Sequence, residues 1–381
     1  MGKAKVKRDA GSLLKVYLII AVAVIALAFI LLIVYAFRTE IRELGVAATH
    51  KSATPRPSEP PTLPPTPTPV PTLVPTPTPT PSPSPTPSPT PTPDGLLGGD
   101  YPDRFADTVV GWVTDPDDPK HMTYKSPKVG IEMTTFLAPN GYTLCHMADI
   151  YIQDISSLFT VLAYDRLGRT GEPQADMGKR GNALLHINGD FYYEQLVQRE
   201  MPGLVIRNST IWLKSYRTDF DLGVLYADGT LETYRQQDVD FASIYAREPL
   251  QVWCFGPALL DEQGQPMEKF NSDVQQANPR TAIGYYKPGH YIFLCADGRV
   301  DESHVGLTMR ELAELMSSLG CKVAYNLDGG QTSMMYADGK LYNFPHKGRR
   351  CSDIVLIREP PEATPSPGLQ EPTPDTGTQK P

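Results

Sequence analysis

Cysteine is scarce in this sequence, and the few cysteines form no recognisable motif. There are five among 381 residues, and no two are spaced as a C-x-x-C pair or as zinc ligands. Each lies in or beside an apolar, strand-like run, so we interpret them as small buried side chains. The pattern argues against a zinc site and favours thiols over disulfides, although the compartment inferred below would permit a bridge.

The sequence also lacks an excess of positive charge. Its formal net charge is −8, whereas surfaces that bind nucleic acid are basic. We therefore expect no nucleic-acid partner. No spacing of ligands compels a metal site either, so we expect no cofactor, with a divalent cation held by two aspartates as a minority alternative.

Charge is absent from one long stretch, Val16–Phe37. Its length of about 22 residues is enough to cross a bilayer as a helix. Residues 1–15 are rich in lysine and arginine, whereas arginine and glutamate balance just beyond the stretch. The positive-inside rule therefore predicts a single-pass anchor at 16–37, with 1–15 in the cytoplasm and the rest outside the cell. A cleaved signal peptide is the alternative, but the apolar run is long for one.

Proline is concentrated in two places. There are 39 prolines, about twice the usual share, and a Pro-Thr/Ser repeat fills most of residues 38–99. Such a segment cannot form a core, and at ~3.1 Å per residue it reaches on the order of 100 Å as an extended stalk. We expect residues 359–381 to be a disordered Pro-rich tail. Anchor and stalk together resemble those of bacterial surface proteins.

Residues 100–358 are long enough for one globular domain. Strand signals dominate it, with turn residues between them. The pattern predicts an α+β fold, mainly mixed or antiparallel β-sheet with a few packed helices. The strands are expected at 131–137, 144–152, 159–164, 183–188, 203–206, 223–226, 251–255, 281–286, 291–296, 322–326, 333–336 and 353–358.

One helix is clearly indicated before residue 320. Thr308 and Glu311 form a capping box, Leu312 and Leu315 belong to an apolar stripe, and Gly320 provides the stop signal. The helix leads directly into the strand at 322–326. A second, weaker helix signal covers 176–182.

Polar clusters follow several of the expected strands. Asn188-Gly189-Asp190, Asp297-Gly298-Arg299 and Asn326-Leu327-Asp328-Gly329-Gly330 each end an apolar run. An isolated Asp-Gly is usually a hairpin turn. Several carboxylates and arginines at the edges of apolar strands, however, favour a site for chemistry.

The order of these motifs resembles that of the phosphodiester glycosidase family. The resemblance covers about 180–358 and is carried by the series as a whole, in the right order. It departs from the family pattern at Gln331, Gly348 and Cys351, which bears on the sugar recognised more than on the fold. The motifs are Asn188–Tyr192, Phe255–Leu259, Pro279–Gly284, Asp297–Arg299, Gly306–Thr308, Asn326–Gly330 and Arg349–Asp353.

The resemblance implies an enzyme that cleaves the bond between the anomeric carbon of a sugar and a phosphodiester oxygen. Phosphate is a good leaving group, so the site must mainly hold an anion and stabilise an oxocarbenium-like transition state. The implied catalytic carboxylates are Asp190 and Asp328. The implied substrate-binding residues are Arg280, Arg299, Arg349, Asn188, Asn326, Asp297, Gly329, Gly330, Thr332 and Ser333.

These residues also admit plainer interpretations. Asn188 and Asn326 could only orient the acids or pin turns, and Asp297 could be a turn residue. The leading hypothesis is an extracytoplasmic hydrolase that acts on sugar 1-phosphodiesters of a cell-surface glycan or glycopolymer. The alternatives are a non-catalytic module that binds surface glycans or anions, and a metal-dependent phosphodiesterase.

Overall fold

Antiparallel pairing joins the strands of this protein into three sheets. The computed structural model describes residues 97, 101–168, 170–192, 203–216, 219–301, 304–345 and 347–361. The predicted anchor at 16–37, nearly all of the stalk and most of the tail lie outside these residues. Within them, no helix combines the length and apolarity needed to span a membrane.

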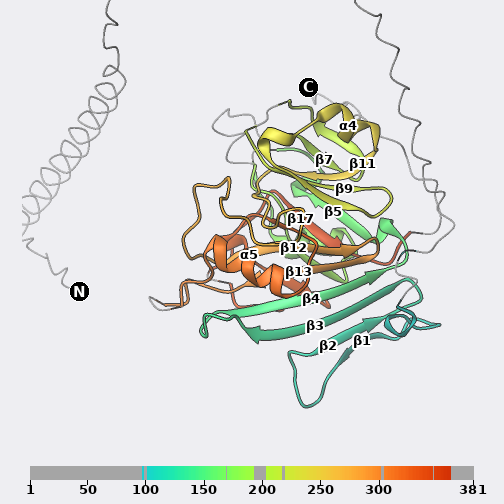
Figure 1. The fold of residues 1–381 in the computed structure, drawn as a ribbon. Helices are drawn as coiled ribbons and strands as arrows, with labels where there is room; N and C mark the ends of the chain where they lie inside the picture. Colours follow the sequence, from blue (N-terminus) through green and yellow to red (C-terminus); the bar gives the residue numbers. More distant parts are fainter. Residues whose placement is uncertain are drawn as a thin grey trace, which may run out of the picture. The chain divides into compact units, whose positions relative to one another are not determined.

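The largest sheet has seven strands, in the order β1-β2-β3-β4-β13-β12-β14 (Figure 1). All of its ladders are antiparallel, and β3 and β4 are paired along their whole length. The strands are β1 (Gly111–Thr114), β2 (Met122–Lys125), β3 (Val129–Leu137), β4 (Leu144–Ile152), β12 (Arg280–Lys287), β13 (His290–Ala296) and β14 (Val323–Asn326).

Two five-stranded sheets complete the domain. One has the order β10-β9-β11-β7-β8 and the other β16-β15-β6-β17-β5. The first contains β7 (Val205–Arg207), β8 (Thr210–Leu213), β9 (Leu222–Tyr226), β10 (Leu231–Tyr234) and β11 (Pro249–Trp253). The second contains β5 (Leu158–Leu162), β6 (Leu185–Asn188), β15 (Met335–Ala337), β16 (Lys340–Leu341) and β17 (Asp353–Ile357).

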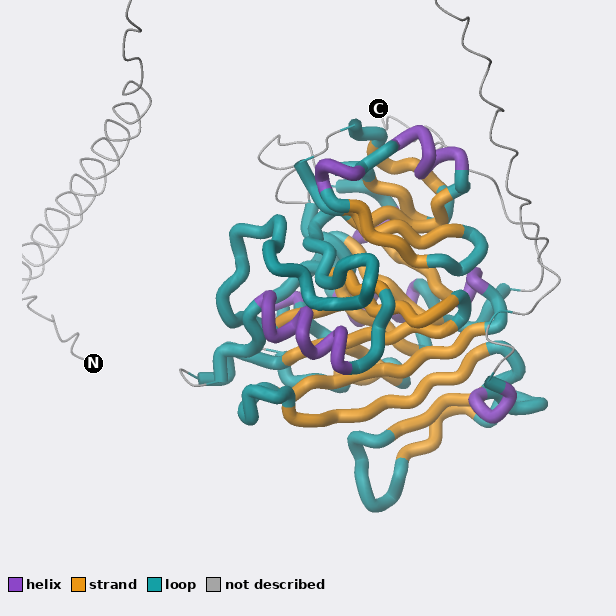
Figure 2. The backbone as a smooth tube through the Cα atoms, viewed as in Figure 1, coloured by secondary structure: helices purple, strands orange, loops and turns teal. Residues whose placement is uncertain are grey.

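Within the part of the chain that the structure describes, helices are few and short (Figure 2). The longest is α5 (Met309–Ser318), and Thr308 caps it through the predicted capping box with Glu311. Its buried leucines and methionines pack against β12 and β13, and burying each contributes about 2 kcal/mol. The other α-helices are α2 (Gln174–Arg180) and α4 (Phe241–Ala246), and short 3₁₀ helices cover 102–104, 155–157, 163–165, 236–238 and 330–332.

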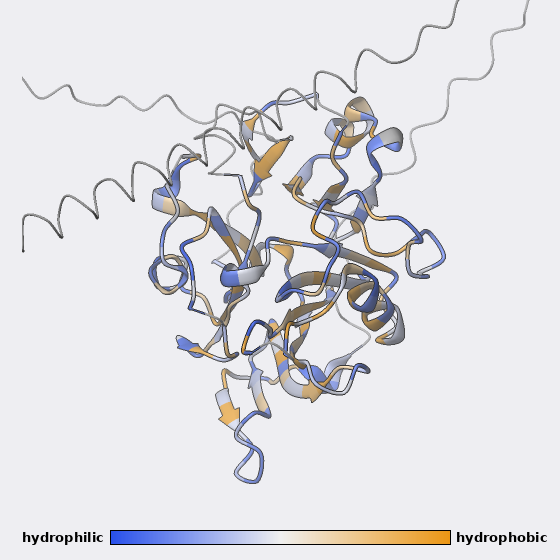
Figure 3. Ribbon diagram, turned by 90° about the vertical axis from the view of Figure 1, so that its left-hand side faces the viewer, coloured by the Kyte–Doolittle hydropathy of each residue, from blue (hydrophilic) through white to orange (hydrophobic). Residues whose placement is uncertain are grey.

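The main core lies where the three sheets meet. Side chains from all of them form one buried cluster, which includes Ile187, Trp253, Phe293, Tyr325 and Val355. The hydroxyl of Tyr325 on β14 donates to the carbonyls of Asp221 (2.9 Å) and Trp253 (3.2 Å), which ties the seven-stranded sheet to the sheet of β9 and β11. Apolar residues are concentrated in the strands, whereas the loop at the tip of the β1–β2 hairpin is hydrophilic (Figure 3).

A buried ion cluster joins the two smaller sheets. Arg207 at the end of β7 is fully buried and donates to Asp353 (2.7 Å) and Asp190 (2.9 Å). It also donates to the carbonyls of Ile206 and Val252. Asp190 also accepts from the backbone N–H groups of residues 254 and 255. The charges are therefore both paired and hydrogen-bonded, as buried charges must be.

The α+β prediction is confirmed, and most of the expected strands are present. The capping-box helix and the second helix are also present. The sequence did not predict β1, β2, β8, β10, β16 and α4, which are short and partly or fully exposed. The prediction also extended β5 to Tyr164, where the chain instead turns through a left-handed conformation (φ 54°) into a 3₁₀ helix. All five cysteines are buried thiols.

Replacing Arg207 with methionine should leave two buried carboxylates without their cation. We expect the free energy of unfolding to fall by about 3–5 kcal/mol, measured by urea denaturation. Arg310→Met is the matched control, because Arg310 is exposed on α5 and pairs only with Glu314 (2.8 Å). It should cost less than about 0.5 kcal/mol. A similar small loss for both variants would contradict the proposed structural role of Arg207.

Candidate active site

The loop that follows β14 presents a buried carboxylate. Asp328 is 5% exposed. One carboxylate oxygen accepts from the N–H of Gly329 (2.7 Å), and the other accepts from the hydroxyl of Thr332 (2.8 Å) and from Arg349 (3.0 Å). The tight 3₁₀ turn at Gly330–Thr332 produces this arrangement, because it folds the Thr332 side chain back over the acid.

Burial and hydrogen bonding shift the pKa of Asp328 in opposite directions. Burial raises the pKa of Asp328 to about 6, while Arg349, Thr332 and the N–H of Gly329 act against this rise. The carboxyl group therefore titrates close to neutral pH. This behaviour suits a group that must be ionised to react and must exchange a proton during a reaction cycle.

Two arginines flank this loop on different sides. Arg349 approaches Asp328 and also lies over the ring of Phe191, 4.9 Å from its centroid. Arg299 is exposed and lies against Gly330, where an added Cβ would come within 3.2 Å of the guanidinium. Gly330 has φ of +67°, so a glycine is needed here both for the conformation and for the close approach of Arg299.

Hydrogen bonds of two asparagines and a threonine support the base of the loop. Asn188 at the end of β6 donates to the carbonyl of Asp328 (2.6 Å) and accepts from the hydroxyl of Thr281 (2.7 Å). The N–H of Asp328 donates to the carbonyl of Gly189 (3.1 Å). Asn326 donates to the carbonyl of Gly256 (2.7 Å). The strand ends of β6, β12 and β14 therefore meet at one place.

A second buried carboxylate, Asp297, follows β13. It lies 2.8 Å from a ring nitrogen of His146 and accepts from the side chain of Asn343 (2.9 Å) and the N–H of Phe344 (3.2 Å). Asn343 also donates to the carbonyl of Ser333 (2.9 Å). Asp297 is thus linked through Asn343 to the loop that carries Asp328.

The comparisons with known proteins agree with this arrangement. A profile of the phosphodiester glycosidase family matches residues 181–358, the part of the chain that contains Asp328 and its flanking arginines. Residues 181–358 therefore belong to the phosphodiester glycosidase family.

Two relatives illustrate the extent of the similarity. The chain is 28% identical over 203 residues to the uncharacterized SPbeta prophage-derived protein YomE of Bacillus subtilis. The match covers 51% of this chain and 31% of that protein. It is 24% identical over 199 residues to N-acetylglucosamine-1-phosphodiester alpha-N-acetylglucosaminidase of Bos taurus. That match covers 50% of this chain and 31% of the bovine protein. The matches therefore span about a third of the length of these curated relatives.

Among solved structures, a similar domain carries the same enzyme name as the bovine relative. It is the zebrafish N-acetylglucosamine-1-phosphodiester alpha-N-acetylglucosaminidase catalytic domain, auto-inhibited by its pro-peptide. The TM-score is 0.48 and the sequence identity 18%, over 66% of this chain and 87% of that one.

The structure brings only some of the predicted site residues to the Asp328 loop. Asp328, Gly329, Gly330, Thr332, Arg299 and Arg349 lie on or against it. The N–H groups of Gly329 and Gly330, expected to bind the substrate, instead donate to Asp328 and to the carbonyl of Pro279. The hydroxyl of Ser333 is buried and has no hydrogen-bond partner among the described residues.

Other predicted residues have contacts of a different kind. Asp190 lies in the ion cluster with Arg207 and Asp353. Arg280 is buried, and its guanidinium donates to the carbonyls of Leu307 (3.0 Å), Val274 (3.0 Å) and Gln276 (2.6 Å). Burial and the nearby Arg299 lower the pKa of Arg280 to about 10. These contacts support the loops around the site, and the predicted reactive role of Asp190 stays a prediction.

Sequence reasoning missed several residues of this region. Arg207 stands in an apolar run, and a charge inside such a run is a signal that it has a buried partner. His146 and Asn343 gave no local signal, because their partner Asp297 is 151 and 46 residues away along the chain. Among the described residues, no cluster of three or more histidine, cysteine or acidic side chains is arranged to hold a metal ion.

Arg349→Met should raise the pKa of Asp328 from about 6 to about 7 or higher, because a nearby cation favours the carboxylate. An NMR titration of the aspartate carboxyl carbons measures this change. The folded-state pKa lies above the unfolded value. The contribution of Asp328 to the free energy of unfolding is therefore fully present below pH ~4 and is lost as the pH rises through 6. In the variant this loss extends to higher pH.

Arg350→Met is the matched control for that titration. Arg350 is the exposed neighbour and donates to Tyr164 (2.9 Å) rather than to Asp328. It should leave the titration of Asp328 unchanged. An unchanged pKa in Arg349→Met, or an equal rise in both variants, would show that the ion pair does not control Asp328.

Proposed function

We propose that this phosphodiester glycosidase hydrolyses the bond between the anomeric carbon of a sugar and an oxygen of a phosphodiester. Its substrate is a cell-surface glycan or glycopolymer, and the reaction takes place outside the cytoplasm. The observation that carries the proposal is the buried Asp328, whose pKa is raised to about 6 and which pairs with Arg349, on a loop whose Gly330 lies against Arg299. A carboxylate on a loop flanked by arginine side chains suits a reaction at a carbon that bears a phosphate.

In the proposed reaction the C1–O bond breaks, and its electron pair stays on the phosphate oxygen. A hydroxyl group from water is added to the anomeric carbon, which yields the free sugar and a phosphomonoester. Asp328 either attacks the anomeric carbon or removes the proton of the attacking water. Retention of the anomeric configuration identifies the first route, and inversion identifies the second.

Arg299 and Arg349 have complementary parts in the proposal. Arg299 is exposed beside Gly330, where it can meet an anionic phosphate that arrives from solvent. Arg349 is held by the Phe191 ring and Asp328, and its side chain is 31% exposed. As charge develops on the leaving phosphate, both guanidinium groups can stabilise it. A strong general acid is then unnecessary, because phosphate leaves readily.

The proposed location rests on the sequence of residues 1–99. The charge-free run at 16–37 and the proline-rich segment after it would hold the enzyme at the cell membrane and carry residues 100–358 away from it. Both segments lie outside the described residues. Protease treatment of intact cells tests this: digestion of the domain in intact cells supports the proposal, and protection until lysis contradicts it.

The activity test uses the full-chain protein and a panel of sugar 1-(methyl phosphates), with release of reducing sugar as the measurement. Asp328→Asn should lower kcat/KM by about 10³-fold, because it removes the reactive carboxylate while keeping its size. Arg299→Met should lower kcat/KM by about 10- to 100-fold, mainly through KM. Arg310→Met on α5 is the control and should have no effect.

Three results would contradict the proposal. One is the lack of turnover with every sugar of the panel. Another is binding of the substrates that survives Asp328→Asn without any hydrolysis, which would identify a glycan- or anion-binding module. The third is loss of activity with a chelator, which would identify a metal-dependent phosphodiesterase.

A further inference from the structure

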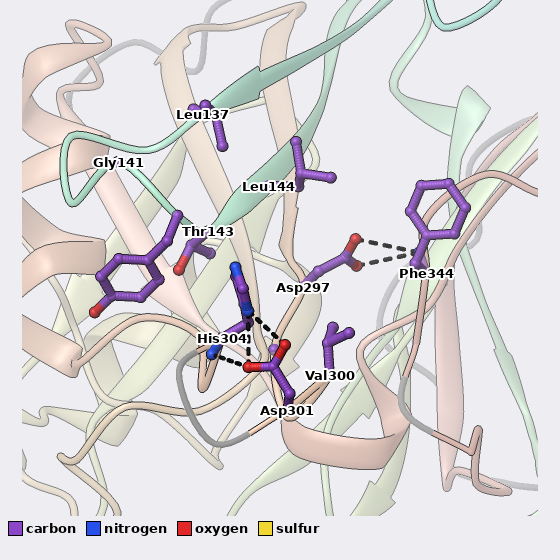
Figure 4. A pocket seen from close by; sticks show the side chains of 11 residues that line it. Leu137, Gly141, Thr143, Leu144, Asp297, Val300, Asp301, His304 and Phe344 are labelled. Atoms are coloured by element: carbon purple, nitrogen blue, oxygen red, sulfur yellow. Dashed lines mark hydrogen bonds and ion pairs between the residues drawn. The ribbon is translucent and has the colours of Figure 1, made fainter.

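A cavity of about 490 Å³ lies beside the candidate active site. Figure 4 shows its walls, which come from the loop between β3 and β4, the segment after β13, and the segment that carries Phe344. Four of its lining side chains are apolar: Leu137, Leu144, Val300 and Phe344. Three of them are strongly exposed for apolar residues, at 57% for Leu137, 62% for Val300 and 55% for Phe344. Exposed apolar groups gathered around a hollow usually mark a binding site.

The cavity adjoins a second hollow, and lining residues of both are chain neighbours of the proposed reaction site. A second hollow of about 670 Å³ shares Val300 and Phe344 with it and extends to Met334 and Gly348. Met334 follows Ser333, and Gly348 precedes Arg349. On the other side, Val300 directly follows Arg299. Residues that line the two hollows are therefore the direct chain neighbours of both arginines proposed to hold the phosphate.

Most of the polar side chains that line the cavity are already engaged by the protein. The Asp297 carboxylate faces His146, Asn343 and the N–H of Phe344. The hydroxyl of Thr143 donates to the carbonyl of Gly306 (3.2 Å). His304 is paired with Asp301 (2.7 Å). The surface offered to a ligand is thus mainly aliphatic and aromatic.

The wall formed by Phe344 is also held in place. The N–H of Phe344 is bound by Asp297, and the ammonium group of Lys120 lies 4.5 Å from the centroid of its ring. Lys120 reaches Phe344 from the loop between β1 and β2 and donates to the carbonyl of Tyr342 (2.5 Å). A fixed apolar wall loses little conformational freedom when a ligand packs against it.

We propose that this cavity binds an alkyl chain carried by the phosphate of the substrate. The inference rests on the proposed function, because it takes the phosphate to lie at Arg299 and Arg349. The substrate is then a glycan whose reducing-end sugar is joined through phosphate to an aliphatic group. A sugar ring in the same cavity would have to leave hydroxyl groups unpaired against apolar walls, which is unfavourable.

The test compares hexyl phosphate with methyl phosphate, the simplest products that such substrates would release. Their binding to the full-chain protein is measured by isothermal titration calorimetry. Hexyl phosphate should bind about ten-fold more tightly, because several extra methylene groups become buried. Val300→Ser should reduce this ratio to less than about three-fold. Val109→Ser is the matched control, since Val109 is 64% exposed and lines neither hollow, and it should keep the ratio.

Each result decides between the two proposals. Equal binding of both phosphates overturns the alkyl site but leaves the phosphate site and the proposed hydrolysis intact. Tighter binding of hexyl phosphate that Val300→Ser does not weaken, or that Val109→Ser weakens equally, also overturns it. Failure of both phosphates to bind overturns the alkyl site together with the phosphate site. Sugar release from the panel of sugar 1-(methyl phosphates) tests the proposed function separately.

Discussion

The pairing of one buried arginine with two buried aspartates holds this domain together. Arg207 lies on one five-stranded sheet, and Asp353 lies on the other. Asp190 follows β6 and accepts from both Arg207 and the backbone after β11. Burial raises the pKa of Asp353 to about 6, although Arg207 acts in the opposite direction. Such a cluster tolerates little change, because removing any one charge leaves another without a partner in a region of low polarity.

The candidate active site depends on that junction. Gly189, one residue before Asp190, accepts from the N–H of Asp328, and its own N–H donates to Asp353. Gly189 therefore connects the Asp328 loop to the ion cluster through its two backbone hydrogen bonds. Adding a Cβ at Gly189 would bring it within 2.2 Å of the Asp353 carboxylate. The close approach that only glycine allows is what lets the two features adjoin.

Buried aspartates serve different purposes in this structure, and their surroundings decide which. Asp190 and Asp353 share a fully buried cation. Asp297 supports Asn343 and the wall segment at Phe344. Asp328 alone among them combines a pKa near 6 with a half-exposed arginine partner and a neighbouring hollow. The same side chain thus supports the fold in some places and is available for chemistry in another.

The sequence by itself determined the features that depend on neighbours in the chain. The capping box of α5, the stop at Gly320 and the strand that ends at Asn326 were all predicted, because a helix cap, a turn and a strand period are local signals. The order of motifs also predicted the family.

Only the tertiary structure decided the roles of the charged residues. Arg207 meets Asp353 across 146 residues, and Arg280, expected to bind phosphate, is held by backbone carbonyls instead. Which charge neutralises which depends on the pairing of distant strands, and no local pattern carries that information.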